Sequence, residues 1–421
     1  MTLRNPDFSL PAGIRTALWL IFAGYVAYVA SMHIGGYERA ARGERPWYTD
    51  FTHTYAGSLL VRYMPAENLY RDPVFVRAMQ EAARVAYGPA LSERQARSIN
   101  FAPWMYPPPF ILAIAPLAFM PYLLAWFVWI GVTAVPYLAA MRAILPGVSA
   151  WRGAWPFALA APTTFSNMMY GQTGFLSAGL IGLGLTQLQR RPLLAGLFIG
   201  LASIKPHLGL LIPVALAAGG HWRAFGAATL TTLGLILASA LVYGLEPWYA
   251  TLGSIDFYVQ GFELGGYGML AMTSVLSTVR VPGGSVEAMW AAQHAATAAM
   301  AVLVAWVWWR GRTCAGSLGL QSAILCFAAP LAVPAVYVYD LALLVPGAAW
   351  LWCDFRARGA AGWEKGVLVV AMAAPMFVYE FAKVSGVQLG AVGVVALLVL
   401  AVRRFRGWKA SDTAAAQAVG A

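Results

Sequence analysis

The sequence has few charged residues. Asp, Glu, Lys and Arg make up only 11% of its 421 residues, whereas 60% of the residues are hydrophobic. An ordinary soluble domain carries roughly 25% charged residues, so the composition excludes that class. It predicts an all-α, polytopic membrane protein whose helices form one lipid-embedded bundle.

Cysteine is scarce too, and its three copies lie far apart, at no spacing typical of metal ligands. We therefore expect no disulfide and no metal site. The sequence also lacks GxGxxG, P-loop, HExxH, GxSxG and CxxC motifs. Soluble nucleotide-sugar or ATP chemistry has no support, and no cofactor is expected. The three cysteines are Cys314, Cys326 and Cys353.

The formal net charge of +11 would suit nucleic acid, but the arginines stand singly or in pairs and form no basic face. This pattern argues against nucleic-acid binding. In membrane proteins, Arg and Lys instead mark cytoplasmic loops. Arg4 and Arg15 precede the apolar run from Ala17 to Ala30, which lacks a good cleavage site and predicts an uncleaved anchor.

The hydrophobic segments predict about twelve crossings with both termini in the cytoplasm. Several segments are shorter than the ~20 residues of a perpendicular span. The stretch 192–219 holds two segments of about 13 residues, joined at Lys205-Pro206, and neither crosses the membrane at ~1.5 Å per residue. One kinked helix would put the arginines on either side of this stretch on opposite faces. We therefore expect two short helices that meet in a cavity open to the outer face. The segments are 14–34, 122–141, 154–168, 173–189, 192–204, 207–219, 224–244, 287–309, 316–333, 341–353, 366–381 and 388–402.

A single membrane domain is expected over residues 1–410, followed by a small, Ala-rich tail, 411–421, that is expected to be disordered. The long first outer loop, 36–106, carries many arginines, but long loops cross the membrane regardless of charge. Two amphipathic helices, 51–63 and 73–87, are expected within it, broken by prolines. A second outer loop, 245–286, is rich in Gly and aromatic residues.

Asp50 is the most informative acid on the expected outer side. It follows Trp47-Tyr48-Thr49, shortly after the first hydrophobic segment, and an amphipathic helix is expected to begin beside it. One interpretation is an N-cap of that helix. The other is a general base that takes a proton from an acceptor hydroxyl at the membrane surface. The two roles are compatible.

Lys205 and Asp340 are charged residues in or at the edge of apolar segments. Lys205 could reach the outer headgroups or hold a phosphate as a point charge. His207 could share that phosphate or face water. Asp340 ends the sequence Tyr337-Val338-Tyr339-Asp340 and is expected either to cap a helix or to line the cavity. Asn167 and Gln172 are polar interruptions at outer helix ends, where an amide most often satisfies the helix end.

A set of short motifs follows in a fixed order along the chain. The motifs are Asp50 after the first helix, Tyr55-Ala56, Asn68-Leu69-Tyr70, Tyr106-Pro107-Pro108 with Pro116-Leu117, Asn167 to Gly171-Gln172, Ala195-Gly196 to Lys205-Pro206, and Tyr339-Asp340. The set resembles the polyprenyl-phosphate-mannose-dependent glycosyltransferases of family 87, which have a GT-C fold. The resemblance covers roughly residues 10–405.

The resemblance implies an inverting, generally metal-free transfer of a sugar, usually mannose and sometimes arabinose, from a polyprenyl-phosphate donor. The acceptor would be a lipid or glycan, and the active site would face the periplasm or cell exterior from a bacterial inner membrane. Asp50 matches the catalytic carboxylate, and Lys205 matches a Lys-Pro element near the donor. The substrate-binding residues expected with them are Tyr106, Asn167, His207, Gln172, Tyr339 and Asp340. The sequence departs from the family in the arginine-rich stretch from Arg71 to Arg97. For this reason the resemblance does not identify the acceptor molecule.

Two other classes compete with the enzyme. A transporter or lipid-linked-sugar flippase would also use broken helices and a charged residue at membrane depth. Such a protein usually has two similar halves, and the sequence has no visible repeat. A scaffold subunit would not need several polar cavity residues on distant segments.

Overall fold

The computed structural model describes residues 9–44, 49–99, 103–145, 149–266, 268–314 and 316–408. About 80% of it is helical, and within these ranges there is no strand, only one isolated antiparallel bridge between Met272 and Tyr337. The expected all-α fold is confirmed. The tail 411–421 and the pair Trp47-Tyr48 lie outside the described residues.

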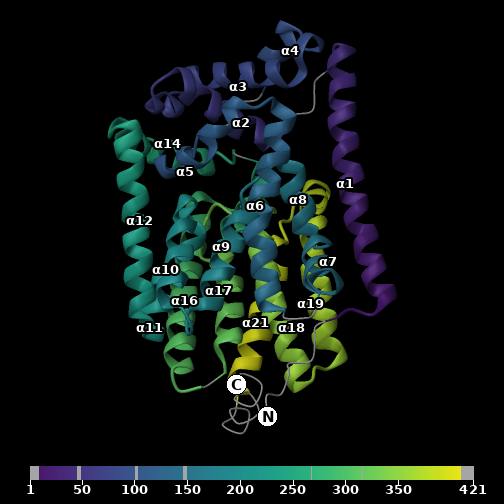
Figure 1. Ribbon diagram of the computed structural model, residues 1–421, viewed down its shortest axis with the longest axis vertical. Helices are drawn as coiled ribbons and strands as arrows, with labels where there is room; N and C mark the ends of the chain where they lie inside the picture. Colours follow the sequence, from purple (N-terminus) through teal and green to yellow (C-terminus); the bar gives the residue numbers. More distant parts are fainter. Residues whose placement is uncertain are drawn as a thin grey trace.

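The molecule is a helix bundle with a helical layer over one end, and the described chain begins and ends, before α1 (Ala12–Ala41) and after α21 (Gly390–Arg406), near the opposite end (Figure 1). We call the layer the cap and the opposite end the terminal end. The cap comes from the first expected outer loop and the residues just after it, and it contains both helices predicted in that loop. Its helices are α2 (Asp50–Tyr63), α3 (Asp72–Tyr87), α4 (Glu93–Arg97) and α5 (Pro108–Ile114), the last continued by η3 (Ala115–Phe119).

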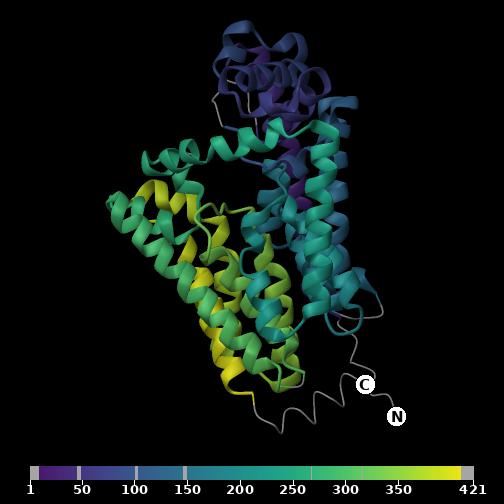
Figure 2. The ribbon, with the colours of Figure 1, turned by 90° about the vertical axis from the view of Figure 1, so that its left-hand side faces the viewer.

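The second expected outer loop is also helical. Its helices extend from the cap end of α12 (Trp222–Tyr243) across the bundle (Figure 2). The first of them packs against η1 (Ala66–Tyr70) of the cap, so the two loops form one layer. The helices are α13 (Glu246–Gly253), α14 (Ile255–Glu263) and α15 (Val275–Arg280).

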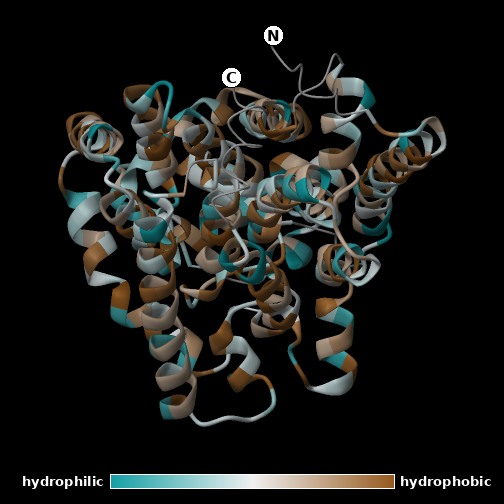
Figure 3. Ribbon diagram, turned by 90° about the horizontal axis from the view of Figure 1, so that it is seen from below, coloured by the Kyte–Doolittle hydropathy of each residue, from teal (hydrophilic) through white to brown (hydrophobic). Residues whose placement is uncertain are grey.

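Four helices are each long and apolar enough to cross a membrane, and a bent pair adds a fifth candidate among the described residues. The bend in that pair, α19 (Gly362–Ala373) with α20 (Val378–Ser385), is 71°. Viewed along the bundle, most helices carry hydrophobic residues around their circumference, as expected for helices that face lipid (Figure 3). The long helices are α1 (Ala12–Ala41), α6 (Tyr122–Ile144), α12 (Trp222–Tyr243) and α16 (Val286–Gly311).

The remaining bundle helices are shorter and match the positions of the other expected segments. Because many are too short to span alone, the expected number of twelve crossings stays a prediction. They are α7 (Ala154–Leu159), α8 (Pro162–Tyr170), α9 (Gly174–Gln187), α10 (Pro192–Leu201), α11 (Ile212–Gly219), α17 (Leu318–Leu331), α18 (Leu344–Arg358) and α21 (Gly390–Arg406).

The chain reverses direction inside the bundle at Lys205. Gly196 of α10 faces Ala224 and Ala227 of α12, and Gly200, one turn later, faces Thr231. The two helices therefore run parallel, so the chain between them must turn back through α11. The reversal uses η5 (Ala202–Ile204) and η6 (Pro206–Gly209), where Pro206 cannot continue a helix. This is the short helical hairpin expected from the sequence.

A second hairpin is formed by α17 and α18. Gly347, near the start of α18, packs against Cys326 and Phe327, near the end of α17, so these helices run antiparallel. The tip between them contains Tyr337, Tyr339 and η8 (Asp340–Leu343). Both hairpins reverse within the bundle, and each places a charged residue at its tip.

Gly179 of α9 sets the contact between α9 and α6. A Cβ atom there would lie 2.3 Å from the Tyr137 nitrogen and 2.5 Å from the Pro136 carbonyl carbon. We expect Gly179→Ala to push the helices apart and to destabilise the protein by about 1–3 kcal/mol, the usual cost of overpacking. Thermal unfolding of the purified protein in detergent measures this. The control is Gly234→Ala on α12, where nothing lies within 4 Å. Equal stability of the two variants would contradict the prediction.

Candidate active site

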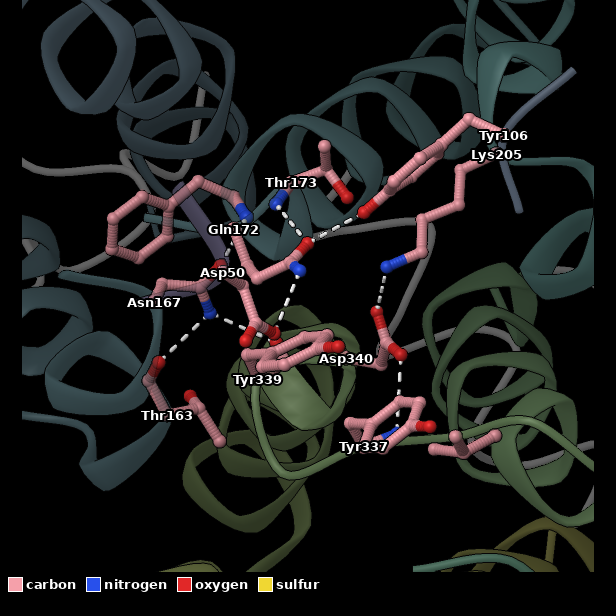
Figure 4. A network of polar contacts seen from close by, with 12 residues as sticks. Asp50, Tyr106, Thr163, Asn167, Gln172, Thr173, Lys205, Tyr337, Tyr339 and Asp340 are labelled. Carbon is pink, nitrogen blue, oxygen red and sulfur yellow. Dashed lines mark hydrogen bonds and ion pairs between the residues drawn. The ribbon is translucent and has the colours of Figure 1, made fainter. Parts of the chain in front are cut away.

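Five chain segments meet where the cap touches the bundle. They are the start of α2, the segment just before α5, the end of α8 with the turn to α9, the α10–α11 tip and the α17–α18 tip (Figure 4). Seven of the eight residues predicted for the site are joined there by polar contacts, and His207 lies beside them. The seven are Asp50, Tyr106, Asn167, Gln172, Lys205, Tyr339 and Asp340.

Asp50 is the first residue of α2, and its carboxylate reaches across to the bundle. The N-cap position belongs to Thr49, and no side-chain capping bond forms. The interpretation of Asp50 as an N-cap is therefore wrong. Its Oδ2 instead accepts a hydrogen bond of 2.9 Å from Nε2 of Gln172. A carboxylate in the first turn is still favoured by the positive end of the helix dipole.

Gln172 is oriented by two donors that face its carbonyl oxygen. The Tyr106 hydroxyl donates to Oε1 over 2.8 Å, and the Thr173 backbone N–H donates to the same atom over 3.3 Å. Because Oε1 is committed to these donors, the amide Nε2 must face Asp50. Burial raises the pKa of the Tyr106 phenol, so this hydroxyl stays a neutral donor.

Two glycines allow the α8–α9 turn to fit against its neighbours. Gly171 has a φ of +65°, and a Cβ atom there would lie 2.4 Å from Cβ of Phe51 in α2. A Cβ atom on Gly174 would lie 2.2 Å from the Tyr339 carbonyl oxygen. The turn therefore packs tightly against the cap on one side and against the α17–α18 tip on the other. Gln172 lies between the two glycines in the sequence.

Lys205 and Asp340 form a buried ion pair between the two hairpin tips. The Lys205 Nζ lies 2.5 Å from Oδ1 of Asp340, and the side chains are 6% and 1% exposed. The other carboxylate oxygen, Oδ2, accepts the Tyr337 backbone N–H over 3.2 Å. Asp340 thus closes its own turn and also holds the lysine. It is the first residue of η8, whose N-cap position belongs to Tyr339 and has no side-chain capping bond, so the interpretation of Asp340 as a helix cap is wrong. Its place in the wall of a cavity stays a prediction.

Tyr339 connects the ion pair to Asp50. Its ring lies 5.1 Å from the Lys205 Nζ, and its side chain acts on Asp50 by favouring the charged carboxylate, which lowers the pKa of Asp50. Asn167 fixes its backbone, donating from Nδ2 to the Tyr339 carbonyl over 2.8 Å. His207 interacts electrostatically with Lys205 and Asp340, but its Nε2 is buried and has no hydrogen-bond partner among the described residues.

The pKa of Asp50 is raised above its ordinary value, chiefly because burial disfavours the charged carboxylate. The hydrogen bond from Gln172, the Tyr339 side chain and the charge of Lys205 act in the opposite direction, whereas the charge of Asp340 adds to the rise. A carboxylate with a raised pKa is a stronger base than an exposed one.

Sequence reasoning gave no role to Tyr337, Thr173 or Tyr170. Tyr337 stacks on Tyr339 with ring centroids 5.4 Å apart, and Tyr170 packs edge-on to Tyr339 at 5.8 Å. The alternation of Tyr337 and Tyr339 was the only local signal for the first of these contacts. Among the described residues, no group of three or more His, Cys, Asp or Glu side chains could hold a metal ion.

Comparison with known families gives one match. The model of glycosyltransferase family 87 matches residues 104–334, more than half of the chain. The chain belongs to glycosyltransferase family 87. The resemblance seen in the sequence is thereby confirmed, and with it the class of activity: the protein is a glycosyltransferase. No curated protein and no solved structure matches it.

The family match covers only part of the candidate site. It includes Tyr106, Asn167, Gln172 and Lys205, but it begins after Asp50 and ends before Tyr339 and Asp340. The structure joins the two sets, because Gln172 bonds Asp50 and Lys205 bonds Asp340. The candidate site therefore extends beyond the matched region.

We expect Lys205→Met to destabilise the protein by about 3–5 kcal/mol, because it leaves the Asp340 carboxylate buried without a counter-charge. The double variant Lys205→Met/Asp340→Asn should recover most of that loss, since the amide oxygen can still accept the Tyr337 N–H. Thermal unfolding in detergent measures both. A double variant as unstable as the single one would show that the ion pair does not hold the tips together.

Proposed function

We propose that this glycosyltransferase inverts the anomeric carbon as it transfers a hexose, mannose, from a polyprenyl-phosphate donor to a hydroxyl of a lipid or glycan acceptor. The observation that carries the proposal is the Asp50 carboxylate, held by Gln172 beside the Lys205–Asp340 pair. It combines a base of raised pKa with a lysine at the point where the cap meets the membrane helices.

In the proposed reaction, Asp50 takes the proton of the acceptor hydroxyl as the oxygen attacks the anomeric carbon. The new carbon–oxygen bond forms as the bond to the donor phosphate breaks, and the lipid phosphate leaves with the electron pair. General-base help of this kind is worth about 10²–10⁴ in rate. The phosphate is a good leaving group, so no acid has to protonate it.

Lys205 is the proposed counter-charge for the leaving phosphate. Its ammonium group has three N–H donors, and Asp340 occupies one of them, so the others can bind phosphate oxygens. Asp340 fixes the lysine in position but also reduces the net charge of the pair. His207, whose Nε2 has no partner among the described residues, is a second candidate donor beside the pair.

The acceptor is proposed to enter from the cap. A pocket of about 220 Å³ there is lined by aromatic side chains and the Asp72 carboxylate. Tyr70 in its wall donates a hydrogen bond of 2.8 Å to the Tyr106 carbonyl, which connects the pocket to the site. Aromatic faces with a few convergent polar groups suit a sugar ring. The other aromatic residues of the pocket are Trp104, Phe257 and Tyr258.

The proposed orientation puts the cap on the outer face of a bacterial inner membrane. Arg190-Arg191, Arg223 and Arg310 lie at the other end, as the positive-inside bias requires of cytoplasmic turns. The donor lipid would then lie in the bilayer with its phosphate at the outer interface, at the level of the hairpin tips.

We expect Asp50→Asn to lower sugar transfer by about 10²–10⁴-fold, because an amide cannot accept the acceptor proton. The amide oxygen can still accept from Gln172, so folding and donor binding should stay near normal. The assay incubates purified protein with radiolabelled polyprenyl-phosphate mannose and a membrane extract and follows new glycolipid or glycan. The matched control is Asp256→Asn on the exposed side of α14.

A wild-type rate for purified Asp50→Asn would remove Asp50 as the base. Movement of the intact labelled donor across the bilayer without any labelled product would instead favour a flippase.

The pH dependence gives a second test. A base must be ionised, so kcat/KM should fall as the pH falls through the raised pKa of Asp50. Gln172→Leu removes a hydrogen bond that lowers this pKa, so the acid limb of the profile should move to higher pH. Gln321→Leu, a buried amide near the terminal end, should leave the limb in place. If the acid limb of the kcat/KM profile is unchanged in Gln172→Leu, a group other than Asp50 is responsible for it.

A further inference from the structure

A second pocket in the described part of the chain lies far from the candidate active site, at the terminal end of the bundle. It has a volume of about 650 Å³ and is formed by the ends of α6 and α9, the start of α17, and α18. Arg190 and Arg191 lie at the turn that follows α9 and line it, and no acidic residue is among the lining residues. The pocket is therefore positively charged.

These two arginines differ from others at the same end. Arg358 pairs with Asp354 at 2.6 Å, and Arg404 bridges Asp354 and Glu364, at 2.7 and 3.3 Å. Arg190 and Arg191 make no ion pair with any residue in the described ranges. Their charge remains available to a ligand.

The inner wall of the pocket contains a buried hydroxyl. Ser322 of α17 is 1% exposed, and its Oγ has no hydrogen-bond partner within the described part of the structure. A buried polar group without a partner costs free energy unless something occupies the space beside it. Because Ser322 lines the same pocket as the arginines, one ligand could contact all three.

Two further features suit a phosphate group. Helix α10 begins at Pro192, directly after Arg191, so the positive end of its dipole adds to the two charges. Trp350 and Leu318 form part of the wall and give the pocket an apolar side. An anion attached to an acyl chain would match this combination.

We infer that this pocket binds a phosphate group, with the two arginines as charged donors and the Ser322 hydroxyl as a neutral one. An anionic phospholipid headgroup and a soluble phosphate both offer this chemistry. The inference does not depend on the proposed sugar transfer, because the pocket shares no residue with the candidate active site.

The test is native mass spectrometry of the purified full-length protein, titrated with phosphatidylglycerol or phosphatidylcholine of identical acyl chains. We expect tighter binding of phosphatidylglycerol, and about a tenfold or greater loss of that affinity in Arg190→Gln/Arg191→Gln, since charge-assisted hydrogen bonds are lost. The matched control, Arg310→Gln/Arg312→Gln, removes the same charge at the same end outside the pocket and should bind as wild type.

A parallel arm adds orthophosphate without lipid and measures the unfolding temperature. If orthophosphate raises the unfolding temperature only when Arg190 and Arg191 are present, and lipid binding does not depend on them, the pocket binds phosphate and its ligand is a soluble one. If neither probe depends on these arginines, the inference is overturned.

A second variant covers the case in which the double arginine variant does not fold. Ser322→Ala changes no charge and removes one neutral hydrogen bond, which should weaken phosphatidylglycerol binding about fivefold. Unchanged affinity in Ser322→Ala would count against the site.

Discussion

The ion pair between Lys205 and Asp340 is the contact on which the candidate site depends. Each residue stands at the tip of a hairpin that reverses inside the bundle, and each would be a costly buried charge alone. Paired, they hold the two tips together and place the Tyr339 ring between the lysine and Asp50. The short helices therefore place polar residues inside the bundle. At the same position, a full-length membrane-spanning helix would carry apolar side chains.

The site divides its parts between the two layers of the molecule. The cap supplies the carboxylate, through the first turn of α2, and the bundle supplies the lysine and the amide that orients that carboxylate. Gly171 lets the α8–α9 turn approach the cap closely enough for Gln172 to reach Asp50, and Gly174 lets the same turn approach the α17–α18 tip. This division suits a reaction between a lipid-borne donor and an acceptor that arrives from the aqueous side.

Positive charge is used differently at the two ends. Near the cap, the lysine is buried and fixed by one acid, so its position is well defined but its net charge is reduced. At the terminal end, Arg190 and Arg191 border an open pocket, whereas Arg358 and Arg404 are tied to acids that join α18, α19 and α21. Arginine clusters that look alike in the sequence therefore have different tasks, and only their surroundings distinguish them.

The sequence by itself determined the fold class, the positions of the helices and the hairpin at Lys205-Pro206, because hydropathy, segment length and proline act locally along the chain. It also singled out the residues that meet in the site. It could not decide whether Asp50 caps a helix, because both roles use the same position at a helix start. Nor could it pair Asp50 with Gln172 or Lys205 with Asp340, which are 122 and 135 residues apart. Only the packing of the hairpins and the cap decides which distant turns meet.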